Sequence, residues 1–521
     1  MHWAEEMARE IIRKYPNEEV YTCASGISPS GSVHIGNFRE IITTYFVVRA
    51  LEDLGKQTRF IFSWDDFDRF RKVPKNIDPS FEQYIGLPYS DIPDPYGCHG
   101  SYAEHFQSEF ESALEEMQID VEFIYQNKEY RSGRYNSKIL YALQHRREIY
   151  DILMAFKTQI PNDDERESFY PIGLYCEDCG RDNTRILSST KDERSLEYKC
   201  SCGHHAHLDV LSARCIKLNW KIDWPMRWQE ENVIFEPGGR DHSSETGSFN
   251  VSKKIVNDIF AFHAPEYVAY EFIGIKGGGS KMSSSSGNVL TPGDLLKVYT
   301  PQVLMFMFSK YQPSAAFNIG LDNDVNRNFS EYERHLSQLE SGRLENDDIA
   351  YALSLAETRE SETKRNIPKF SQVAGLLPLI NYDQTLLRQV FERSGEHFSL
   401  SEVSEIADRV EYWIQTYNHE KNICVNENLN KKYFDTLISD DRMWIEAFNS
   451  IVQNWSDYKP EEVMRRVYDI CFDVDVKIKR SNQKRLFKHI YNLILGQDSG
   501  PRIPLLIEAV GIEKCKNLLN A

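Results

Sequence analysis

The segment from Ser25 to Asn37, SGISPSGSVHIGN, combines small residues with a histidine. It follows a short apolar run and precedes a helical pattern, which predicts a turn between a strand and a helix. Its glycines let a ligand approach the backbone, and the helix N-terminus offers N–H groups to phosphate. His34 can donate a hydrogen bond to a phosphoryl group whose charge grows during displacement. The alternative is a plain helix-capping turn. The candidate polyphosphate contacts are Ser30, Gly31, His34, Gly36 and Asn37.

A second segment, KGGGSKMSSSSGN, runs from Lys276 to Asn288 and follows another predicted strand. Its three consecutive glycines predict a mobile loop, on which Lys276 and Lys281 can close over a polyphosphate. A flexible linker is the alternative, but ligands of open α/β sheets bind at the carboxyl ends of strands, where this loop begins. The candidate contacts are Lys276, Lys281, Met282 and Ser283.

Four cysteines have the composition of a tetrahedral zinc site: Cys176, Cys179, Cys200 and Cys202. The first pair has the spacing of a zinc knuckle, whereas the second pair is a tighter C-x-C. One of the nearby histidines, His204, His205 or His207, could therefore replace a thiolate. Four unliganded thiols in a reducing cytosol are the alternative.

A second cluster follows the pattern Asp-x3-Cys-His-x5-His and contains Asp94, Cys98, His99 and His105. These four residues could close another zinc site within twelve positions. Scattered histidines in a surface loop are the alternative. Both clusters lie in the long insertion between the two halves of the predicted sheet, so we expect both to be structural rather than catalytic.

The elements around the first segment form a β-loop-α-β unit. A strand is predicted at Val20–Ala24, a helix begins near His34 and ends before Gly55, and a second strand covers Thr58–Ser63. The two strands should be parallel and buried in a doubly wound sheet.

Regular patterns return after a polar, irregular stretch. Residues Lys217–Trp224 alternate strictly between apolar and polar, which predicts a strand. A strand (Val233–Phe235), a helix (Ser248–Phe262) and a strand (Tyr267–Ile275) follow. This second half indicates one nucleotide-binding sheet interrupted by a long insertion, and beyond Thr291 helical patterns dominate.

Composition limits the class of protein. The length of 521 residues argues for three or four domains, and a hydrophobic fraction of 41% supplies apolar residues for their cores. No apolar run is long enough for a membrane span, and the N-terminus lacks a secretory signal, so we expect a cytoplasmic protein with no membrane partner. A net charge of −18 excludes indiscriminate phosphate binding by the whole surface.

The C-terminal stretch Val476–Leu495 departs from this acidic balance, because it contains no acidic residue. A basic helical face of this kind can bind RNA phosphates, although a merely solvated face is the alternative. The candidate RNA contacts are Lys477, Lys479, Arg480, Lys484 and Arg485.

The two phosphate-binding segments, taken in this order, resemble the HIGH and KMSKS signatures of class I aminoacyl-tRNA synthetases. Asn37 replaces the second histidine and Ser284 replaces the second lysine. HIGN with KMSSS resembles the class I lysyl-tRNA synthetase branch of that family. Four further blocks are similar to that branch: Ser63–Pro74, Lys221–Trp228, Phe235–His242 and Tyr270–Gly277.

The resemblance implies an α/β fold: a doubly wound, Rossmann-like catalytic domain formed by residues 1–66 and 216–300. A zinc-bearing insertion would occupy 67–215, and an all-α anticodon-binding region 301–521. The implied activity is ATP-dependent ligation of lysine to tRNA(Lys) in the cytoplasm, with Mg²⁺ and structural Zn²⁺. Lys281 would stabilise the leaving pyrophosphate and His34 would contact phosphate, while Lys276 or Mg²⁺ compensates for the lysine missing at Ser284.

Lysine offers two ammonium groups and an aliphatic stem, so its site needs carboxylates and aromatic faces. Asp66 and Glu271 are additional candidate carboxylates, and Trp224 is better explained by core packing. The candidate amino-acid contacts are Gly26, Ser28, Asp65, Trp220, His242 and Tyr270.

Three alternatives stay open. A small nucleotidyltransferase shares the HIGH-like turn but lacks so long a helical tail. A synthetase for another amino acid, such as glutamate, shares the chemistry, although the KMSSS variant and the WDD block argue against it. A non-enzymatic, zinc-containing nucleic-acid-binding protein would explain the cysteines but leaves both phosphate-binding segments without a role.

Overall fold

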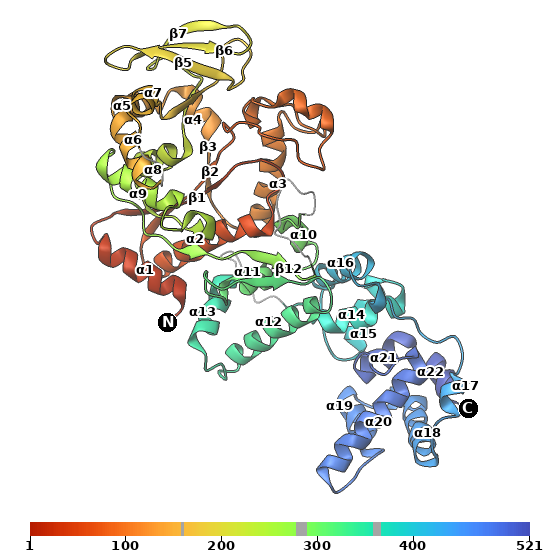
Figure 1. The fold of residues 1–521 in the computed structure, drawn as a ribbon. Helices are drawn as coiled ribbons and strands as arrows, with labels where there is room; N and C mark the ends of the chain where they lie inside the picture. The colour runs from red at the N-terminus through yellow and green to blue at the C-terminus, as the bar shows by residue number, and fades with distance from the viewer. Residues whose placement is uncertain (158–160, 278–288, 358–365, 521) are drawn as a thin grey trace. The chain divides into compact units, whose positions relative to one another are not determined.

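The computed structural model describes residues 1–157, 161–277, 289–357 and 366–520 (Figure 1). The chain forms two compact units. The first comprises Met1–Leu296, Leu304–Ile319 and Leu344–Thr358, and the second comprises Lys297–Val303, Gly320–Arg343 and Arg359–Ala521. The first unit mixes helices and strands, whereas the regular elements described in the second are helices.

A four-stranded parallel sheet organises the first unit. Its order is β3 (Glu122–Tyr125), β2 (Gln57–Trp64), β1 (Val20–Ile27) and β9 (Val233–Phe235). The helix α2 (Ile35–Asp53) connects β1 to β2 and is buried around most of its circumference, because apolar residues lie on all its sides. The predicted β-loop-α-β unit is therefore confirmed.

The strand order places a topological switch point between β1 and β9. From β1 the chain continues to β2 and β3 on one side, whereas β9 joins the other side of β1 after a long excursion. In open parallel sheets a crevice forms outside the carboxyl ends of the strands at such a point. The residues that follow β1 and β9 thus border a ready binding site.

The sheet contains one strand that the sequence patterns did not identify. β3 lies inside the segment 67–215, between the two halves of the sheet expected from the sequence, and pairs with β2 from Ile61↔Glu122 to Trp64↔Tyr125. The long segment between these halves therefore contributes an edge strand as well as its own elements.

The strand predicted at Lys217–Trp224 is wrong. A short strand, β8 (Ile216–Leu218), pairs antiparallel with β4 (Ile172–Leu174), and the helix α8 (Trp220–Glu231) begins at once. Apolar residues spaced by two also recur at a spacing of four, so the pattern fits a helix equally well. The rings of Trp220 and Trp224 accordingly stack at 5.0 Å. Ser252 donates to the Lys221 carbonyl, which Pro225 leaves without its helical partner.

The strand predicted at Tyr267–Ile275 is divided in two. β11 (Ala269–Tyr270) pairs with β10 (Gly238–Gly239), and β12 (Ile273–Ile275) pairs with β13 (Phe317–Ile319). β13 is a strand within the segment expected to be entirely helical. The predicted helix Ser248–Phe262 is present as α9 (Ser248–Asp258).

The remaining elements of the segment 67–215 are short helices and a small antiparallel sheet. Figure 1 shows this sheet, β5–β6–β7, set apart from the parallel sheet. The elements are α3 (Tyr102–Glu116), α4 (Gln126–Ser132), α5 (Asn136–Gln144), α6 (Arg146–Ala155), α7 (Asp163–Ser168), β5 (Thr184–Ser189), β6 (Ser195–Cys200) and β7 (His205–Asp209). The first unit also contains α1 (Trp3–Lys14), α10 (Pro292–Leu296) and α13 (Asp347–Ala356), and α11 (Pro301–Ser309) begins in the second unit and ends in the first.

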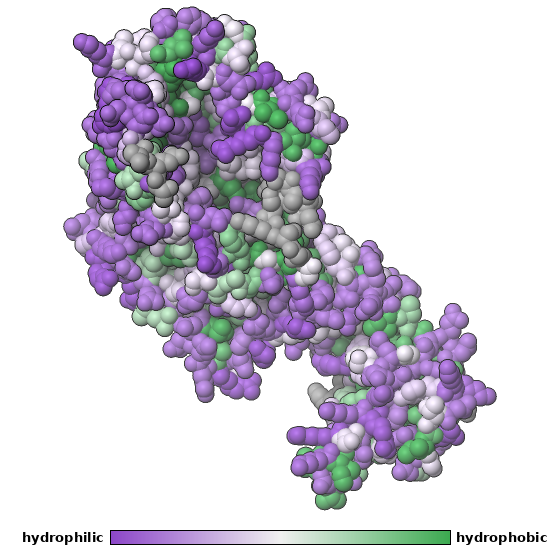
Figure 2. Space-filling view, viewed as in Figure 1, coloured by the Kyte–Doolittle hydropathy of each residue, from purple (hydrophilic) through white to green (hydrophobic). Residues whose placement is uncertain are grey.

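Helices build the second unit, as the sequence predicts. Its C-terminal part has a core of its own that includes Phe448, Ile490 and Leu506. Hydrophilic side chains cover most of the face seen in Figure 2, and no helix among the described residues is long and apolar enough to cross a membrane. The helices are α12 (Asp324–Glu340), α14 (Phe370–Leu376), α15 (Gln384–Arg393), α16 (Leu400–Thr416), α17 (Lys431–Phe434), α18 (Ser439–Gln453), α19 (Pro460–Asp469), α20 (Val476–Leu495), α21 (Ile503–Val510) and α22 (Ile512–Leu519).

Candidate active site

A cavity of about 810 Å³ opens in the first unit at the switch point of the sheet. It brings together side chains from the β1–α2 turn, from the end of β2, from the start of α8 and from the β10–β12 region. Most of the residues proposed from the sequence line it: Gly26, Ser28, His34, Gly36, Asn37, Asp65, Trp220, His242 and Tyr270. Ser30 and Gly31 belong to the same turn but lie outside this lining.

The β1–α2 turn explains why small residues are needed at this edge. A Cβ on Gly26 would lie 2.9 Å from the Ser63 carbonyl oxygen of the neighbouring strand, so only glycine fits there. His34 is the N-cap of α2, and its Nδ1 accepts a hydrogen bond from the Asn37 N–H at 3.3 Å. The imidazole is thereby held at the helix N-terminus, where a phosphate would bind.

Glu40, six residues beyond this cap, was not proposed from the sequence. Its carboxylate accepts hydrogen bonds from the Gly26 N–H at 3.0 Å and from the Tyr270 hydroxyl at 2.8 Å. Burial raises the pKa of Glu40 to about 8, and no cation among the described residues forms an ion pair with it. A carboxylate among the apolar residues of the first half of α2 was the signal that could have identified it.

A smaller pocket of about 70 Å³ continues inward from the cavity. Trp220, Trp224 and Trp228 line it, spaced four residues apart on one face of α8. Trp228 donates its indole N–H to Glu236 at 2.6 Å, and burial raises the pKa of Glu236 to about 7. Trp224 packs against both neighbouring tryptophans, which agrees with its expected core role.

A buried charge network supports the wall of the cavity. Arg227 lies 2.8 Å from Asp65 and 3.2 Å from Asp223, and Lys217 lies 2.8 Å from Asp68 and 3.2 Å from Asp223. The network contains three carboxylates and two cations, so its net charge is −1 when all its groups are ionised. Breaking such a buried pair is costly, which fixes the orientation of its members.

Two of these carboxylates face the cavity. Asp65 and Asp68 both belong to its lining, and Asp68 also accepts a hydrogen bond from the Ser28 hydroxyl at 3.0 Å. The other carboxylates considered from the sequence are engaged elsewhere. Asp66 accepts from Gln107 and from the Asn127 N–H, and Glu271 pairs with Arg240 at 2.7 Å.

The charges around the two connected pockets are unbalanced. Glu40 and Glu236 are hydrogen-bonded to neutral donors, and the adjoining network already has a net negative charge. A carboxylate buried without a cation is unstable in its charged form, so a cationic ligand would relieve both groups. The site thus suits an ammonium group on an apolar stem and disfavours an acidic side chain.

The second phosphate-binding segment is described only at its start. Lys276 is exposed and its N–H donates to the Ile319 carbonyl, just beyond β12. Lys281, Met282 and Ser283 lie outside the described residues, so their proposed roles stay predictions.

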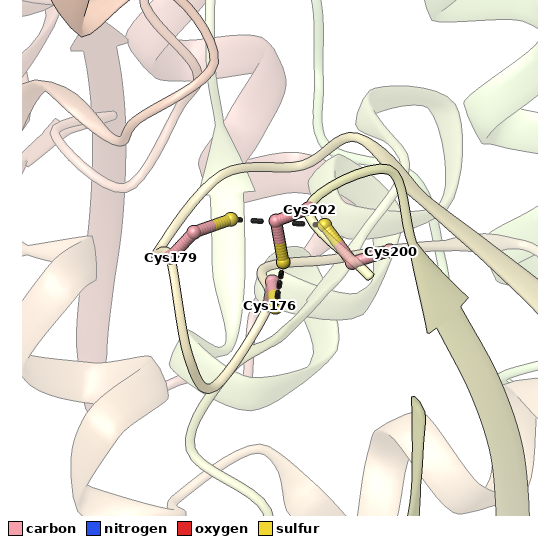
Figure 3. A group of neighbouring side chains, drawn as sticks. All are labelled: Cys176, Cys179, Cys200 and Cys202. Atoms are coloured by element: carbon pink, nitrogen blue, oxygen red, sulfur yellow. Dashed lines mark hydrogen bonds between the residues drawn. The ribbon is translucent and has the colours of Figure 1, made fainter. Parts of the chain in front are cut away.

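The four cysteines of the first cluster lie together, and their side chains point toward one another (Figure 3). The sulfur atoms of Cys176 and Cys202 are 3.8 Å apart, and those of Cys179 and Cys200 are 3.6 Å apart. Four thiolates held about 2.3 Å from a tetrahedral zinc ion have nearly this separation. The donor set and its geometry therefore fit zinc, and no histidine is needed as a replacement ligand.

The second predicted cluster also comes together. Cys98 Sγ lies 3.2 Å from His99 Nδ1 and 3.4 Å from His105 Nδ1, and His105 Nδ1 lies 3.3 Å from an Asp94 oxygen. Burial alone would raise the pKa of Asp94. Hydrogen bonds from backbone N–H groups have a larger effect and lower this pKa to about 2. The Asp94 carboxylate is thus ionised and ready to bind a metal ion.

The basic stretch forms α20 in the second unit. Lys477, Arg480 and Lys484 are exposed, whereas Lys479 lies 4.8 Å from the ring centre of Phe472. Arg485 lies 2.8 Å from Asp441, so part of its charge is already neutralised.

Comparison with known proteins agrees with this site. Residues 1–362 match the family model described as tRNA synthetases class I (K). A lysine–tRNA ligase from Treponema pallidum is 34% identical over 100% of this chain and 98% of its own length. A lysine–tRNA ligase from Pyrococcus horikoshii is 33% identical over 96% of each chain. Because this family model matches more than half of the chain, the chain belongs to the class I (K) family of tRNA synthetases.

Proposed function

We propose that the protein activates lysine with ATP and transfers it to the 3′ end of tRNA(Lys). One observation carries the choice of amino acid: Glu40 and Glu236 are buried at the connected pockets and form no ion pair with any described residue, although the charge of Arg227 lowers the pKa of Glu236. The ε-ammonium of lysine would supply the missing charge, and Trp220 would cover the aliphatic stem. The lysine–tRNA ligases listed above support the same assignment.

The acidic character of the pocket argues against glutamate as the substrate. Arg227 in its lining and Lys217 in the adjoining network are already paired with Asp65, Asp68 and Asp223. A ligand carboxylate would lie beside Glu40 and would find no unpaired cation among the described lining residues, so it would gain no charge partner and would keep Glu40 protonated.

The phosphate end of the reaction belongs to the β1–α2 turn. His34 at the N-cap, the N–H group of Gly36 and the side chain of Asn37 would contact ATP, with the dipole of α2 directed at its phosphates. The lysine carboxylate then attacks the α-phosphate, a step that depends on positioning and charge neutralisation. Mg²⁺ bound with ATP would supply part of that neutralisation, and Lys281 would stabilise the departing pyrophosphate.

Zinc has a structural role in this proposal. Cys176, Cys179, Cys200 and Cys202 would hold one ion, and Asp94, Cys98, His99 and His105 would hold another. Both clusters are closed sets of four ligands, with no ligand position left for a substrate. Each would fix a loop of the segment 67–215.

The helix α20 would contact tRNA(Lys). Lys477, Lys479, Arg480, Lys484 and Arg485 would supply charge for phosphates. Beside them Phe472 is 62% exposed and Val474 is 90% exposed, which offers apolar surface to unstacked bases. An aromatic ring bordered by cations is typical of surfaces that bind single-stranded RNA.

Amino-acid-dependent ATP–pyrophosphate exchange tests this proposal. The purified protein should be assayed with each of the twenty amino acids, with and without tRNA(Lys). We expect exchange with lysine under at least one of the two conditions. Exchange with glutamate would redirect the assignment, and the absence of exchange with any amino acid would favour a non-enzymatic nucleic-acid-binding role.

A further inference from the structure

A groove in the second unit carries positive charge that the proposed active site does not use. It has a volume of about 520 Å³ and lies between α12 and the start of α14. Its cations are Arg334, Arg343 and Lys369, and three serines, Ser330, Ser337 and Ser371, share its lining. All six of these side chains are exposed.

The helical periodicity of α12 builds one wall of this groove. Ser330, Arg334 and Ser337 recur at spacings of four and three, so they lie on one face of the helix. Arg343 follows the end of α12 beyond Gly342, whose φ of +65° turns the chain back toward this face. The groove is therefore a consequence of two regular elements and a glycine turn.

The opposite wall is fixed to α12 by side-chain contacts. Phe329 stacks on Phe370 with ring centres 4.1 Å apart, and Glu333 accepts a hydrogen bond from the Phe370 N–H at 3.1 Å. These contacts place Lys369 and Ser371, on either side of Phe370, against α12. They also direct the Glu333 carboxylate to the backbone of α14, so the one acid in the lining is already engaged.

The hydrogen-bonded partners of the two arginines are neutral. Arg334 Nη2 lies 3.2 Å from His335 Nε2, and Arg343 Nε donates to the Ser341 hydroxyl at 2.9 Å. The groove thus has three cations and one carboxylate, a local charge of +2, on a chain whose net charge is −18. Among the described residues neither arginine has a carboxylate partner, and guanidinium groups that converge with hydroxyls have the chemistry of a phosphate-backbone site.

We propose that this groove binds the sugar–phosphate backbone of tRNA, with Arg334, Arg343 and Lys369 each neutralising a phosphate. The proposal rests on the proposed function, which makes tRNA the substrate. The groove would contact no base, so it would contribute affinity and orientation. The contacts to unstacked bases would come from α20.

The salt dependence of tRNA binding tests the groove. Affinity for a tRNA(Lys) transcript should be measured between about 50 and 300 mM salt for the wild type, for Arg334→Ala, Arg343→Ala and Lys369→Ala, and for the triple variant. Each phosphate contact contributes about 0.7–0.9 to the slope of log affinity against log salt concentration. Each single variant should therefore lower that slope by about this amount and weaken binding about 5- to 10-fold, and the triple variant should lose about 2–3 in slope.

Two controls isolate the effect of charge. Arg327 is on the same helix, is 74% exposed and pairs with Asp324 at 2.7 Å outside the groove, so Arg327→Ala should leave the slope unchanged. Arg334→Lys keeps a positive charge and should restore most of the slope lost in Arg334→Ala. The loss should also be equal for a transcript with an altered anticodon, because a backbone contact does not distinguish base sequence.

The outcomes separate this inference from the proposed function. Lysine-dependent exchange at saturating tRNA should be unchanged in the groove variants. If the wild type activates lysine but all three variants keep the wild-type slope, the groove is not a tRNA site and the proposed function stands. If no amino acid is activated, the proposed function fails, while a lowered slope would still assign the groove to RNA.

Discussion

The Tyr270 hydroxyl donates a hydrogen bond of 2.8 Å to Glu40, whose other oxygen accepts from the Gly26 N–H. This relationship joins β11 to α2 and to the end of β1, and it holds in the cavity a carboxylate that forms no ion pair with any described residue. A cationic ligand would complete the arrangement, and lysine carries such a charge on an aliphatic stem.

Replacing Glu40 tests whether its negative charge binds the ammonium group of lysine. Glu40→Gln keeps the size of the side chain but removes its charge, so kcat/KM for lysine should fall on the order of 10²–10³-fold, since one partner of a buried charge pair is lost. The apparent affinity for ATP should change less than about threefold. Steady-state ATP–pyrophosphate exchange measures both quantities.

The control for this variant is Glu271→Gln. Glu271 is partly buried and close in sequence to Tyr270, but it pairs with Arg240 and lies outside the cavity lining. Its substitution should leave kcat/KM for lysine within about twofold of the wild type. Equal losses in the two variants would show that Glu40 has no specific role in binding lysine.

Lysine activation should also depend on pH. Burial raises the pKa of Glu236 to about 7 and the pKa of Glu40 to about 8, so both are largely protonated at pH 6. The ε-ammonium keeps its proton throughout this range, because its ordinary pKa is about 10.4. Deprotonation of the two carboxyls therefore strengthens lysine binding, and kcat/KM for lysine should rise from pH 6 to about 9 and then level off.

The same measurement on Glu40→Gln identifies the group that titrates. The rise near pH 8 should disappear in this variant, while a rise near pH 7 from Glu236 persists. A profile that falls with increasing pH in the wild type would contradict the proposed role of both carboxylates.

The mobile loop predicted from the sequence gives a kinetic test. Lys281→Ala should lower the rate of adenylate formation on the order of 10²–10³-fold with a smaller change in ATP affinity, because its ammonium acts as charge moves onto pyrophosphate. Lys276→Ala should be milder if Lys276 is auxiliary, and comparable if it compensates for the lysine missing at Ser284. Pre-steady-state adenylate formation distinguishes these cases. If Lys281→Ala weakened only the affinity for ATP, the loop would bind ATP in the ground state and would not stabilise the transition state.

If the two clusters hold zinc as proposed, substitutions of their ligands should affect folding before they affect chemistry. Cys176→Ala and Cys98→Ser should each reduce the zinc content by about one ion per chain and lower the thermal stability, because metal binding contributes to the free energy of folding. The control is Cys424→Ser, since Cys424 is an exposed thiol outside both clusters. Elemental analysis and thermal denaturation measure these effects. A folded, active wild type without zinc would refute the structural role.

The sequence predicted the parts of the fold that local patterns determine. The strand–turn–helix unit around His34 and both metal clusters could be predicted because their ligands and glycines are close in the chain. Lys217–Trp224 was misassigned because spacings of two and four coincide in a short apolar run, and only packing among the tryptophans distinguishes them. Glu40, Glu236 and the network around Asp223 were missed because their significance arises from tertiary burial.

The transfer of labelled lysine to tRNA tests the central claim most directly. The purified, zinc-loaded protein should be incubated with ATP, Mg²⁺, a tRNA(Lys) transcript and either labelled lysine or labelled glutamate, and the acid-precipitable label should be counted. The account predicts ATP-dependent attachment of lysine to tRNA(Lys), with no attachment of glutamate and a large loss in Glu40→Gln. Attachment of glutamate, or no attachment of lysine by a folded protein, would contradict it.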